Sequence, residues 1–409
     1  MNPLFRSILP LLAASVFVAG GCNLGRTVDK VTLKRLAPGM LAVGDVGLGC
    51  ASGGALSPAL IALGHRSDGK KEPKKAAALT LIAAGMCSER AAWEADLERA
   101  RLRYMAGNGG SPVLGTAMED LTIKAQRFHR EAAARNLAAY QRVVEVYGAP
   151  TEARACPPRL RERDEVLFLL GMTAGLLATL HDVQAERSVG VSQSIPNRVV
   201  EGAACLDNDR WWGLPAALES AVAGSLSGAV TPSVDPWVGL RAAAIKGEAS
   251  GLWLGRALQL QTAYSAGRTD DMWAAIEAHG AALGRSAAAG EDGAGAANAE
   301  YALLNAYASE MIEFRSDVFW IGATGHRTPL GQLGTRPPEE VSEEDVAGFL
   351  DGLGGDDGAG DGPAPEATGA TPANGDGPTS EAVEPPAQPS EPPPGVASPT
   401  PTNSAMTNN

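Results

Sequence analysis

The sequence predicts an all-α protein built as an array of antiparallel helical hairpins. Apolar residues in the long segments recur at the three-to-four-residue spacing of a helix, and no run alternates convincingly as a strand would. Breaks rich in Gly, Asn and Pro, such as residues 107–112, separate these segments. Because the breaks are short, successive helices should lie side by side. We therefore expect a helical-repeat-like domain over residues 36–330.

The chain begins with a segment that has the plan of an export signal. Arg6 precedes an apolar run too short to span a bilayer as a mature helix, and small residues lead into Cys22. This pattern resembles the signal of bacterial lipoproteins. The resemblance implies a signal peptide over residues 1–21, a diacylglycerol on the Cys22 sulfur, a tether over residues 22–35, and, from Asn23, an outer-membrane anchor facing the periplasm. An ordinary secretory signal with a coincidental cysteine is the alternative.

Three long helices are expected next. Residues 36–64 are small, apolar and rich in glycine, with Asp45 nearly alone as a charge. Their length allows a membrane span, but such small residues favour a closely packed helix in a buried position. Further helices are predicted over residues 74–106 and 115–147. The acids and bases that alternate over residues 89–103 are typical of a solvated helix face.

The second half of the body predicts shorter helices. Residues 166–180 carry no charge but are too few to span a bilayer, so the helix over residues 161–187 should be buried. Capping residues and prolines then predict a series of helices. These are expected over residues 196–205, from residue 215, over residues 235–266, from residue 270 through 279, and over residues 298–321.

The cysteines other than Cys22 predict two disulfides. An even number of cysteines, Cys50, Cys87, Cys156 and Cys205, favours disulfides in an oxidising compartment, with buried free thiols as the alternative. If the first two long helices form an antiparallel hairpin turning near Gly69, then Cys50 and Cys87 lie almost equally far from the turn. Equal rise per residue places them at the same height on facing helices. Cys156 then pairs with Cys205 by exclusion.

Residues 331–409 form a different kind of segment, rich in Pro, Gly, Ala, Ser, Thr and acids. Fourteen acidic residues against Arg336 give this segment a net charge of -13, which is the charge of the whole chain. Such a segment buries too little apolar surface to fold and is expected to be a disordered acidic tail. One short helix is expected over residues 342–353, because its apolar residues form one stripe that docks on a partner or on the body.

Local motifs do not indicate an enzyme. The five histidines lie far apart, and no H-x-x-x-H, H-E-x-x-H or C-x-x-C motif occurs, so neither a metal ion nor a cofactor is expected. The nearly neutral body offers no basic face for nucleic acid.

The candidate binding residues lie in one polar loop and are Asp207, Asp209, Trp211 and Trp212. The acids are expected to cap a helix or solvate the loop. One tryptophan should pack inward while the other lines a groove or interface, and wedging of both rings between helices is the alternative.

Two resemblances bear on function. Residues 258–276 are similar to the middle of a tetratricopeptide repeat, because a helix ends in Ala-Tyr and a Gly-Arg turn before an acid opens the next helix. The chain also resembles the T-component lipoproteins that accompany TRAP-type solute transporters, in Cys22, the helical body and residues 205–221. This resemblance implies a lipid-anchored, tetratricopeptide-like protein.

These features predict a lipid-anchored periplasmic helical protein that binds a small solute or a partner protein between helical hairpins. Under the resemblance, it is an accessory component of a TRAP-type transporter. One alternative is an envelope-assembly scaffold that recruits a partner through its tail, and another is a cell-envelope hydrolase. A deep enclosed cavity would favour solute binding, an exposed groove would favour the scaffold, and clustered Glu, Asp or His in a cleft would favour the hydrolase.

Overall fold

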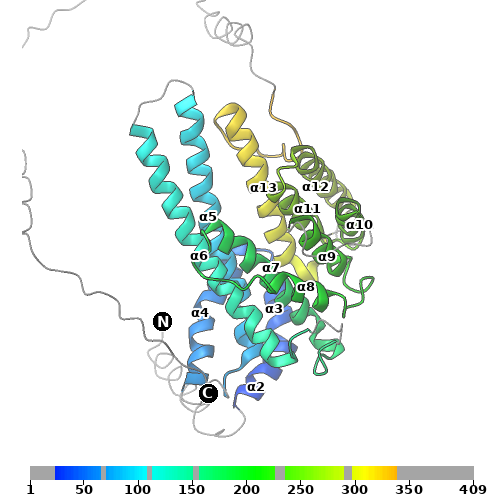
Figure 1. The fold of residues 1–409 in the computed structure, drawn as a ribbon. Coiled ribbons are helices and arrows are strands. Elements are labelled where there is room, and N and C mark those ends of the chain that lie inside the picture. The colour runs from blue at the N-terminus through cyan, green and yellow to red at the C-terminus, as the bar shows by residue number, and fades with distance from the viewer. Residues whose placement is uncertain are drawn as a thin grey trace, which may run out of the picture. The chain divides into compact units, whose positions relative to one another are not determined.

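A computed structural model of the protein describes residues 24–65, 71–107, 113–150, 156–225, 235–289 and 297–338. Over these ranges every regular element is a helix, as the periodicity predicts. Successive helices pack as adjacent pairs (Figure 1). The expected signal peptide, Cys22 and the expected helix over residues 342–353 lie outside the described residues.

The stretch expected to be a tether is helical from its third residue. It forms α2 (Leu24–Val31) and the π-helical turn η1 (Thr32–Leu36), which continue into α3 (Ala37–Leu41). An Asp29 carboxylate oxygen accepts a hydrogen bond from the backbone N–H of Ala76, 3.1 Å away in the first turn of α5. Since a helix leaves its first N–H groups without partners inside the helix, this bond ties α2 to the body.

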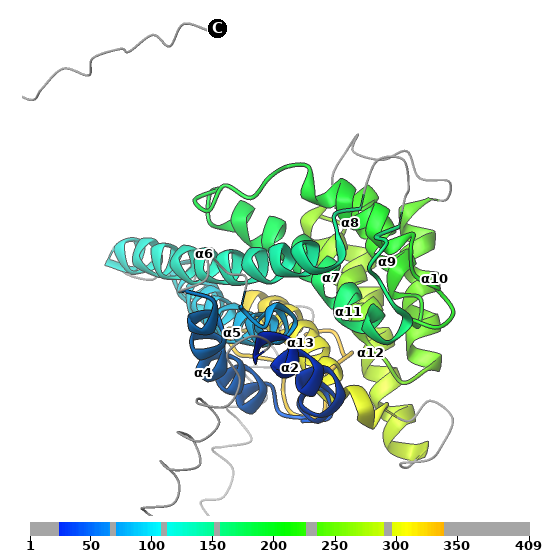
Figure 2. The same ribbon diagram turned by 90° about the horizontal axis from the view of Figure 1, so that it is seen from below.

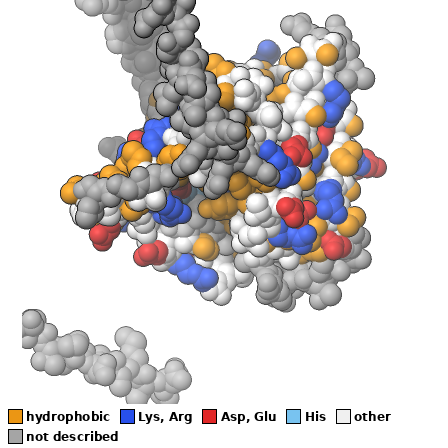
Figure 3. Space-filling model, turned by 90° about the horizontal axis from the view of Figure 1, so that it is seen from above, with side chains coloured by type: hydrophobic (Ala, Val, Ile, Leu, Met, Phe, Trp, Pro, Cys, Tyr) orange, Lys and Arg blue, Asp and Glu red, His pale blue; other side chains and the backbone are white. Residues whose placement is uncertain are grey.

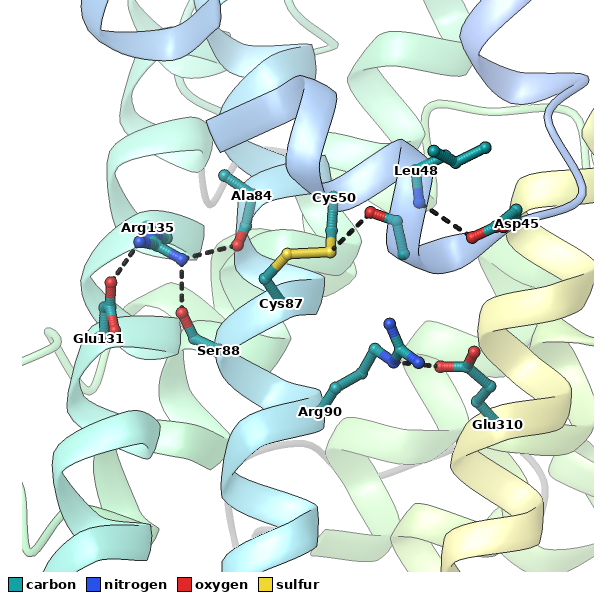
Figure 4. Close-up of a disulfide and its surroundings, with 11 residues drawn as sticks. Asp45, Leu48, Cys50, Ala84, Cys87, Ser88, Arg90, Glu131, Arg135 and Glu310 are labelled. Atoms are coloured by element: carbon teal, nitrogen blue, oxygen red, sulfur yellow. Dashed lines mark hydrogen bonds and ion pairs between the residues drawn. A yellow bond between two sulfur atoms is a disulfide. The ribbon is translucent and has the colours of Figure 1, made fainter. Parts of the chain in front are cut away.

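The first predicted hairpin is formed by α4 (Val46–His65) and α5 (Lys74–Gly107). Cys50 and Cys87 are joined by a disulfide with their Cα atoms 5.3 Å apart (Figure 4), as the equal spacing from the turn predicts. The helices approach closely because α4 presents glycine here. A Cβ atom on Gly53 would lie 2.5 Å from the backbone oxygen of Thr80. Cys156 and Cys205 form the second disulfide, with a Cα separation of 5.4 Å.

Two details of the first apolar segment differ from the prediction. Residues 36–64 form two helices, because the chain breaks at residues 43–45 between α3 and α4. Only one face of α4 is buried, and the side chain of Leu48 is 63% exposed. The glycines that suggested burial let one face approach α5, and the opposite face has no comparable neighbour among the described helices.

The long hairpin of α5 and α6 (Val113–Tyr147) forms one side of the body (Figure 1). The core is centred on α7 (Glu165–Gln184), which follows the short η2 (Glu162–Asp164) and is buried as predicted. Its largest buried side chains include Phe168, Met172 and Leu176.

The remaining helices pack in sequence around one side of α7 and return to α5 (Figure 2). They are α8 (Ile195–Ala203), α9 (Leu214–Ser225), α10 (Pro236–Ala249), α11 (Leu254–Ser265), α12 (Thr269–Ala289), η3 (Ala299–Tyr301) and α13 (Ala302–Thr324). The single helix expected over residues 235–266 is therefore wrong. Gly251 breaks it with a φ of 70°, a left-handed conformation that glycine adopts without strain.

The body continues past the predicted boundary at residue 330. The indole N–H of Trp320 donates to the backbone oxygen of Thr335, 3.2 Å away. The Arg336 guanidinium pairs with Glu277 of α12 at 2.9 Å. Residues counted with the tail on composition alone thus contact α12 and α13.

Candidate functional site

The structure places the four predicted binding residues in a packed loop between α8 and α9. Trp211 is buried, and its indole N–H donates to Glu165 at 2.9 Å. The Trp212 ring packs edge-on against Trp211 and Tyr301, with centroids 5.3 and 4.6 Å away. Both rings thus pack against neighbours within the chain, and Trp212 adopts a left-handed backbone with φ of 54°.

The two acids of this loop also have partners within the chain. Asp207 accepts hydrogen bonds from the backbone N–H groups of Asp209 and Arg210. Asp209 pairs with Lys246 of α10. All four predicted side chains therefore interact within the chain and stabilise the loop.

A line of buried polar side chains crosses the core between α13, α5, α7 and α6. Tyr307 donates from its hydroxyl to Glu89, which is almost wholly buried. Glu89 lies 3.2 Å from Nε2 of His181, and Nδ1 of His181 lies 3.0 Å from Nδ1 of His129. Nε2 of His129 faces Asp96 at 3.4 Å. We call these five residues the buried relay.

Counting protons assigns the charge of the buried relay. With both carboxyl groups ionised, the three contacts between Glu89, His181, His129 and Asp96 each need one proton on an imidazole nitrogen. Two neutral imidazoles supply only two N–H groups, so all three bonds form only when one imidazole is charged. An imidazolium at His181 would face the buried Glu89 carboxylate directly. His129 then accepts from His181 and donates to Asp96.

The surroundings agree with this assignment. Burial lowers the pKa of His129 and thereby favours its neutral form. Burial alone would raise the pKa of Glu89, but the charge of His181 and hydrogen bonds from three partners lower it on balance. Arg315 is also buried nearby, with its guanidinium 3.5 Å above the Tyr264 ring. Two carboxylates thus stand against one imidazolium and one guanidinium.

The cavity beside Glu89 is small. It is lined by Asn136, Thr173, Tyr307 and apolar side chains, and its volume of about 20 Å³ suits roughly one water molecule. This cavity therefore does not admit a solute. The chain of contacts in the buried relay can hold a proton and pass it between Glu89 and the partly exposed Asp96. Within the described ranges, no three His, Cys, Asp or Glu side chains are placed to hold a metal ion.

An open groove of about 350 Å³ runs between α5 and α13, and we call it the α5–α13 groove. Its floor includes Leu97 and the stacked rings of Trp93 and Phe314, whose centroids are 5.4 Å apart. Its walls carry Arg90 and Glu94 from α5, Glu310, Glu313 and Asp317 from α13, and Arg327 from the segment that follows. Figure 4 shows Arg90 and Glu310 facing each other across the two helices.

The α5–α13 groove has more acid than base. Arg90 pairs with Glu310 at 2.8 Å, and Arg327 donates to Glu94 at 3.1 Å. Glu313 has no ion-pair partner among the described residues. Burial raises the pKa of Glu310, Glu313 and Asp317, and repulsion between neighbouring carboxylates adds to the rise at Glu310 and Glu313. Four carboxylates against two guanidiniums leave a net charge of about -2 at neutral pH.

This charge is local. Seen from above, acidic, basic and apolar side chains are interspersed over the face in Figure 3, without a broad basic area. A second open groove, against α6, is instead lined by Lys124, Arg127 and Arg130. The two grooves differ in sign, although the body as a whole is nearly neutral.

The sequence reasoning missed both sites, although it contained a signal for one. Met86, Glu89 and Trp93 are three and four residues apart and therefore share one helix face. A carboxylate between two large apolar residues on that face indicates a buried acid. The alternating charges over residues 89–103 instead predict a solvated face, which is wrong for Glu89. The α5–α13 groove joins residues more than 200 positions apart, and no local pattern marks it.

No family model, curated protein or solved structure matches this chain. The site must therefore be interpreted from its own geometry.

Proposed function

We propose that the chain is a lipid-anchored helical scaffold of the cell envelope whose α5–α13 groove receives a basic segment of a partner. The observation that carries this proposal is the net negative charge of an open groove with an apolar floor. A Lys or Arg side chain suits such a groove, because its aliphatic stem can lie on apolar surface while its charge meets the acidic walls.

The chain's own side chains support this choice of ligand. Arg327 lies between Glu94 and Asp317, and its hydrogen bonds to Glu94 raise the pKa of its guanidinium. The groove thus already holds a cationic side chain, while Glu313 has no partner among the described residues. From Glu310 to Asp317, α13 rises about 10 Å, which matches roughly three residues of an extended peptide.

The envelope location and the anchor belong to the same proposal. The paired cysteines are typical of an oxidising compartment, and Cys22 is the expected lipid attachment site. A tetratricopeptide-like arrangement is supported by the turn between α11 and α12. There Gly267, with φ of 66°, joins helices that pack against each other, as the resemblance over residues 258–276 implies.

Binding of a fluorescent oligolysine peptide tests the proposal. Replacing the unpartnered acid, Glu313→Gln, should weaken binding about two- to fivefold, the effect of one exposed ion pair. The reversal Glu313→Lys should weaken it roughly tenfold, and added salt should weaken binding to the parent protein. The matched control is Glu119→Lys on the exposed surface of α6. Equal losses in Glu313→Lys and Glu119→Lys, or no binding by the parent, would contradict the proposal.

A hydrolase is the second candidate, because the α5–α13 groove also gathers carboxyl groups whose pKa is raised. A raised pKa keeps a carboxyl group protonated closer to neutral pH, as a general acid requires. Under this candidate, purified protein should cleave cell-wall polymer, and Glu313→Gln should abolish cleavage. Peptide binding without any cleavage would favour the scaffold.

A further inference from the structure

The start of α2 lies very close to the expected lipid. Leu24 is the first residue of α2 and only two residues after Cys22. Two residues span at most about 7 Å. Because Asp29 ties α2 to α5, only Asn23 stands in the sequence between Cys22 and a helix that is bound to the body. An acyl chain on Cys22 therefore brings the surface around α2 to the bilayer.

That surface is basic. Arg26, Lys30 and Lys34 are all exposed, and their spacing of four residues places them along one face of α2 and η1. Val31 and Leu36 are exposed beside them. Exposed basic and apolar side chains together are typical of helices that lie at the surface of an anionic membrane.

The exposed face of α4 adds an uncharged surface. No charged residue occurs from Val46 to Gly64, a segment long and apolar enough to cross a membrane. One face of α4 is fixed to α5 by the Cys50–Cys87 disulfide, so α4 cannot span the bilayer alone. Its other face exposes Leu48 and Leu56.

We infer that the end of the body formed by α2, η1 and α4 lies on an anionic lipid bilayer. The inference rests on the anchoring at Cys22 within the proposed function. An anionic bilayer suits this surface, because α2, η1 and α4 combine the expected acyl site, three exposed basic residues and an uncharged helix face. Figure 1 shows α2 and α4 at the end opposite the tip of the α5–α6 hairpin, so this hairpin projects away from the membrane.

Depth-dependent quenching tests the inference on the full chain in vesicles. One bimane probe is attached after Ala62→Cys, exposed near the end of α4 that lies closest to α2, and another after Met105→Cys, near the hairpin tip. The native pairs Cys50–Cys87 and Cys156–Cys205 do not compete for the label, and the signal of the labelled parent chain, which reports any free Cys22, is subtracted. In phosphatidylcholine vesicles with phosphatidylglycerol, nitroxide lipids should quench the probe at position 62 several-fold more than the probe at position 105. Aqueous iodide should give the reverse order.

The charge requirement is tested separately. The triple variant Arg26→Gln, Lys30→Gln and Lys34→Gln should reduce nitroxide quenching at position 62 to its level in vesicles of phosphatidylcholine alone. The matched control, Arg101→Gln, Arg103→Gln and Arg130→Gln, removes three exposed bases from α5 and α6 and should leave the quenching unchanged.

Mass spectrometry of Cys22 distinguishes a failure of the acyl anchor from a failure of the membrane-facing surface. If Cys22 is acylated and iodide quenches both probes equally, the anchor stands and the membrane-facing surface is overturned. If Cys22 is not acylated and position 62 is still quenched by nitroxide lipids, the surface stands and the anchor is overturned. If the protein is neither acylated nor bound to vesicles, both fail.

Discussion

Two helices of almost equal hydropathy have different environments in this protein. The most apolar windows of α4 and of residues 162–184, which include α7, have mean hydropathies of 1.6 and 1.7. Yet 28% of the first window is buried, against 72% of the second. The sequence predicts that both helices are buried. Hydropathy therefore shows that a helix can be buried, whereas its neighbours decide how much of it is.

The side chains explain the difference. α7 carries large buried apolar residues around its circumference, such as the consecutive Leu167, Phe168 and Leu169, and it packs against α5, α6, α8 and α9. In α4, nine of the twenty residues are glycine or alanine. Its glycines permit contact with α5 on one side, but its small side chains reach few neighbours on the other. Large side chains hold α7 against several helices. Close backbone contact with α5 and one disulfide hold α4.

Truncating one leucine in each helix should give the largest contrast. Leu176 of α7 is about 1% exposed, so Leu176→Ala leaves a cavity and should lower the free energy of unfolding by roughly 2–5 kcal/mol. Leu48→Ala on the exposed face of α4 should change it by less than about 0.5 kcal/mol. Denaturant unfolding of both variants provides the measurement. Similar losses would show that the face of α4 is covered within the body.

Local patterns predicted much of the fold. The long helices and the Cys50–Cys87 pair follow from helical periodicity and from equal distances to one turn. The pattern on both sides of Ser250 and Gly251 is helical, and one glycine inside a helix is often tolerated. The sequence therefore does not predict the break at Gly251. The positive φ of Gly251 depends on the packing of α10 against α11, which no local pattern encodes.

The candidate sites could be predicted much less well. Glu89 and His181 come from helices about 90 residues apart, and the walls of the α5–α13 groove are more than 200 residues apart in the sequence. Their partnership depends on how α13 returns to α5. The tryptophan pair was conspicuous in the sequence because it is local, yet its rings pack inside the body.

Removing the Cys50–Cys87 disulfide should release α4 more than α7. The double substitution Cys50→Ala and Cys87→Ala opens a cross-link between residues 37 positions apart and should cost roughly 2–4 kcal/mol. Hydrogen exchange should show the loss of protection concentrated in α4. The matched control, Cys156→Ala and Cys205→Ala, should leave the protection of α4 unchanged relative to the other helices. Equal exchange of α4 in both variants would mean that packing alone holds it.

Adding one methyl group to a glycine should have opposite effects in the two helices. A Cβ atom on Gly171 of α7 would lie 2.6 Å from the Val143 side chain, so Gly171→Ala should destabilise by about 1–3 kcal/mol. A Cβ atom on Gly54 of α4 meets nothing within 4 Å. Gly54→Ala should therefore stabilise by about 0.5–1 kcal/mol, because alanine favours the helix more than glycine does. Thermal unfolding gives the sign directly, and a loss at Gly54 would reveal an unseen neighbour.

Acidification should change the stability contributions of Asp29 and Glu89 in opposite directions. At Asp29, which ties α2 to the body, burial raises the pKa from 3.8 to about 6, so between these values the folded state binds the proton more tightly than the unfolded state. The stability that this group contributes is complete below about pH 4 and is lost as the pH rises through 6. Glu89 beside α7 has a lowered pKa, so its contribution is instead lost on acidification.

A single substitution isolates the contribution of Asp29. Asp29→Asn keeps an oxygen that can accept from the N–H of Ala76 but removes the charge. The variant should be more stable than the parent at pH 7, by about 1 kcal/mol after allowance for solvent screening of this half-buried group, and equal to it at pH 4. Unfolding at both pH values, with Asp120→Asn on the exposed face of α6 as control, provides the measurement. A variant less stable at pH 7 would show that the Asp29 carboxylate holds α2 through its charge, and that the membrane-facing end is strengthened, not weakened, by ionisation.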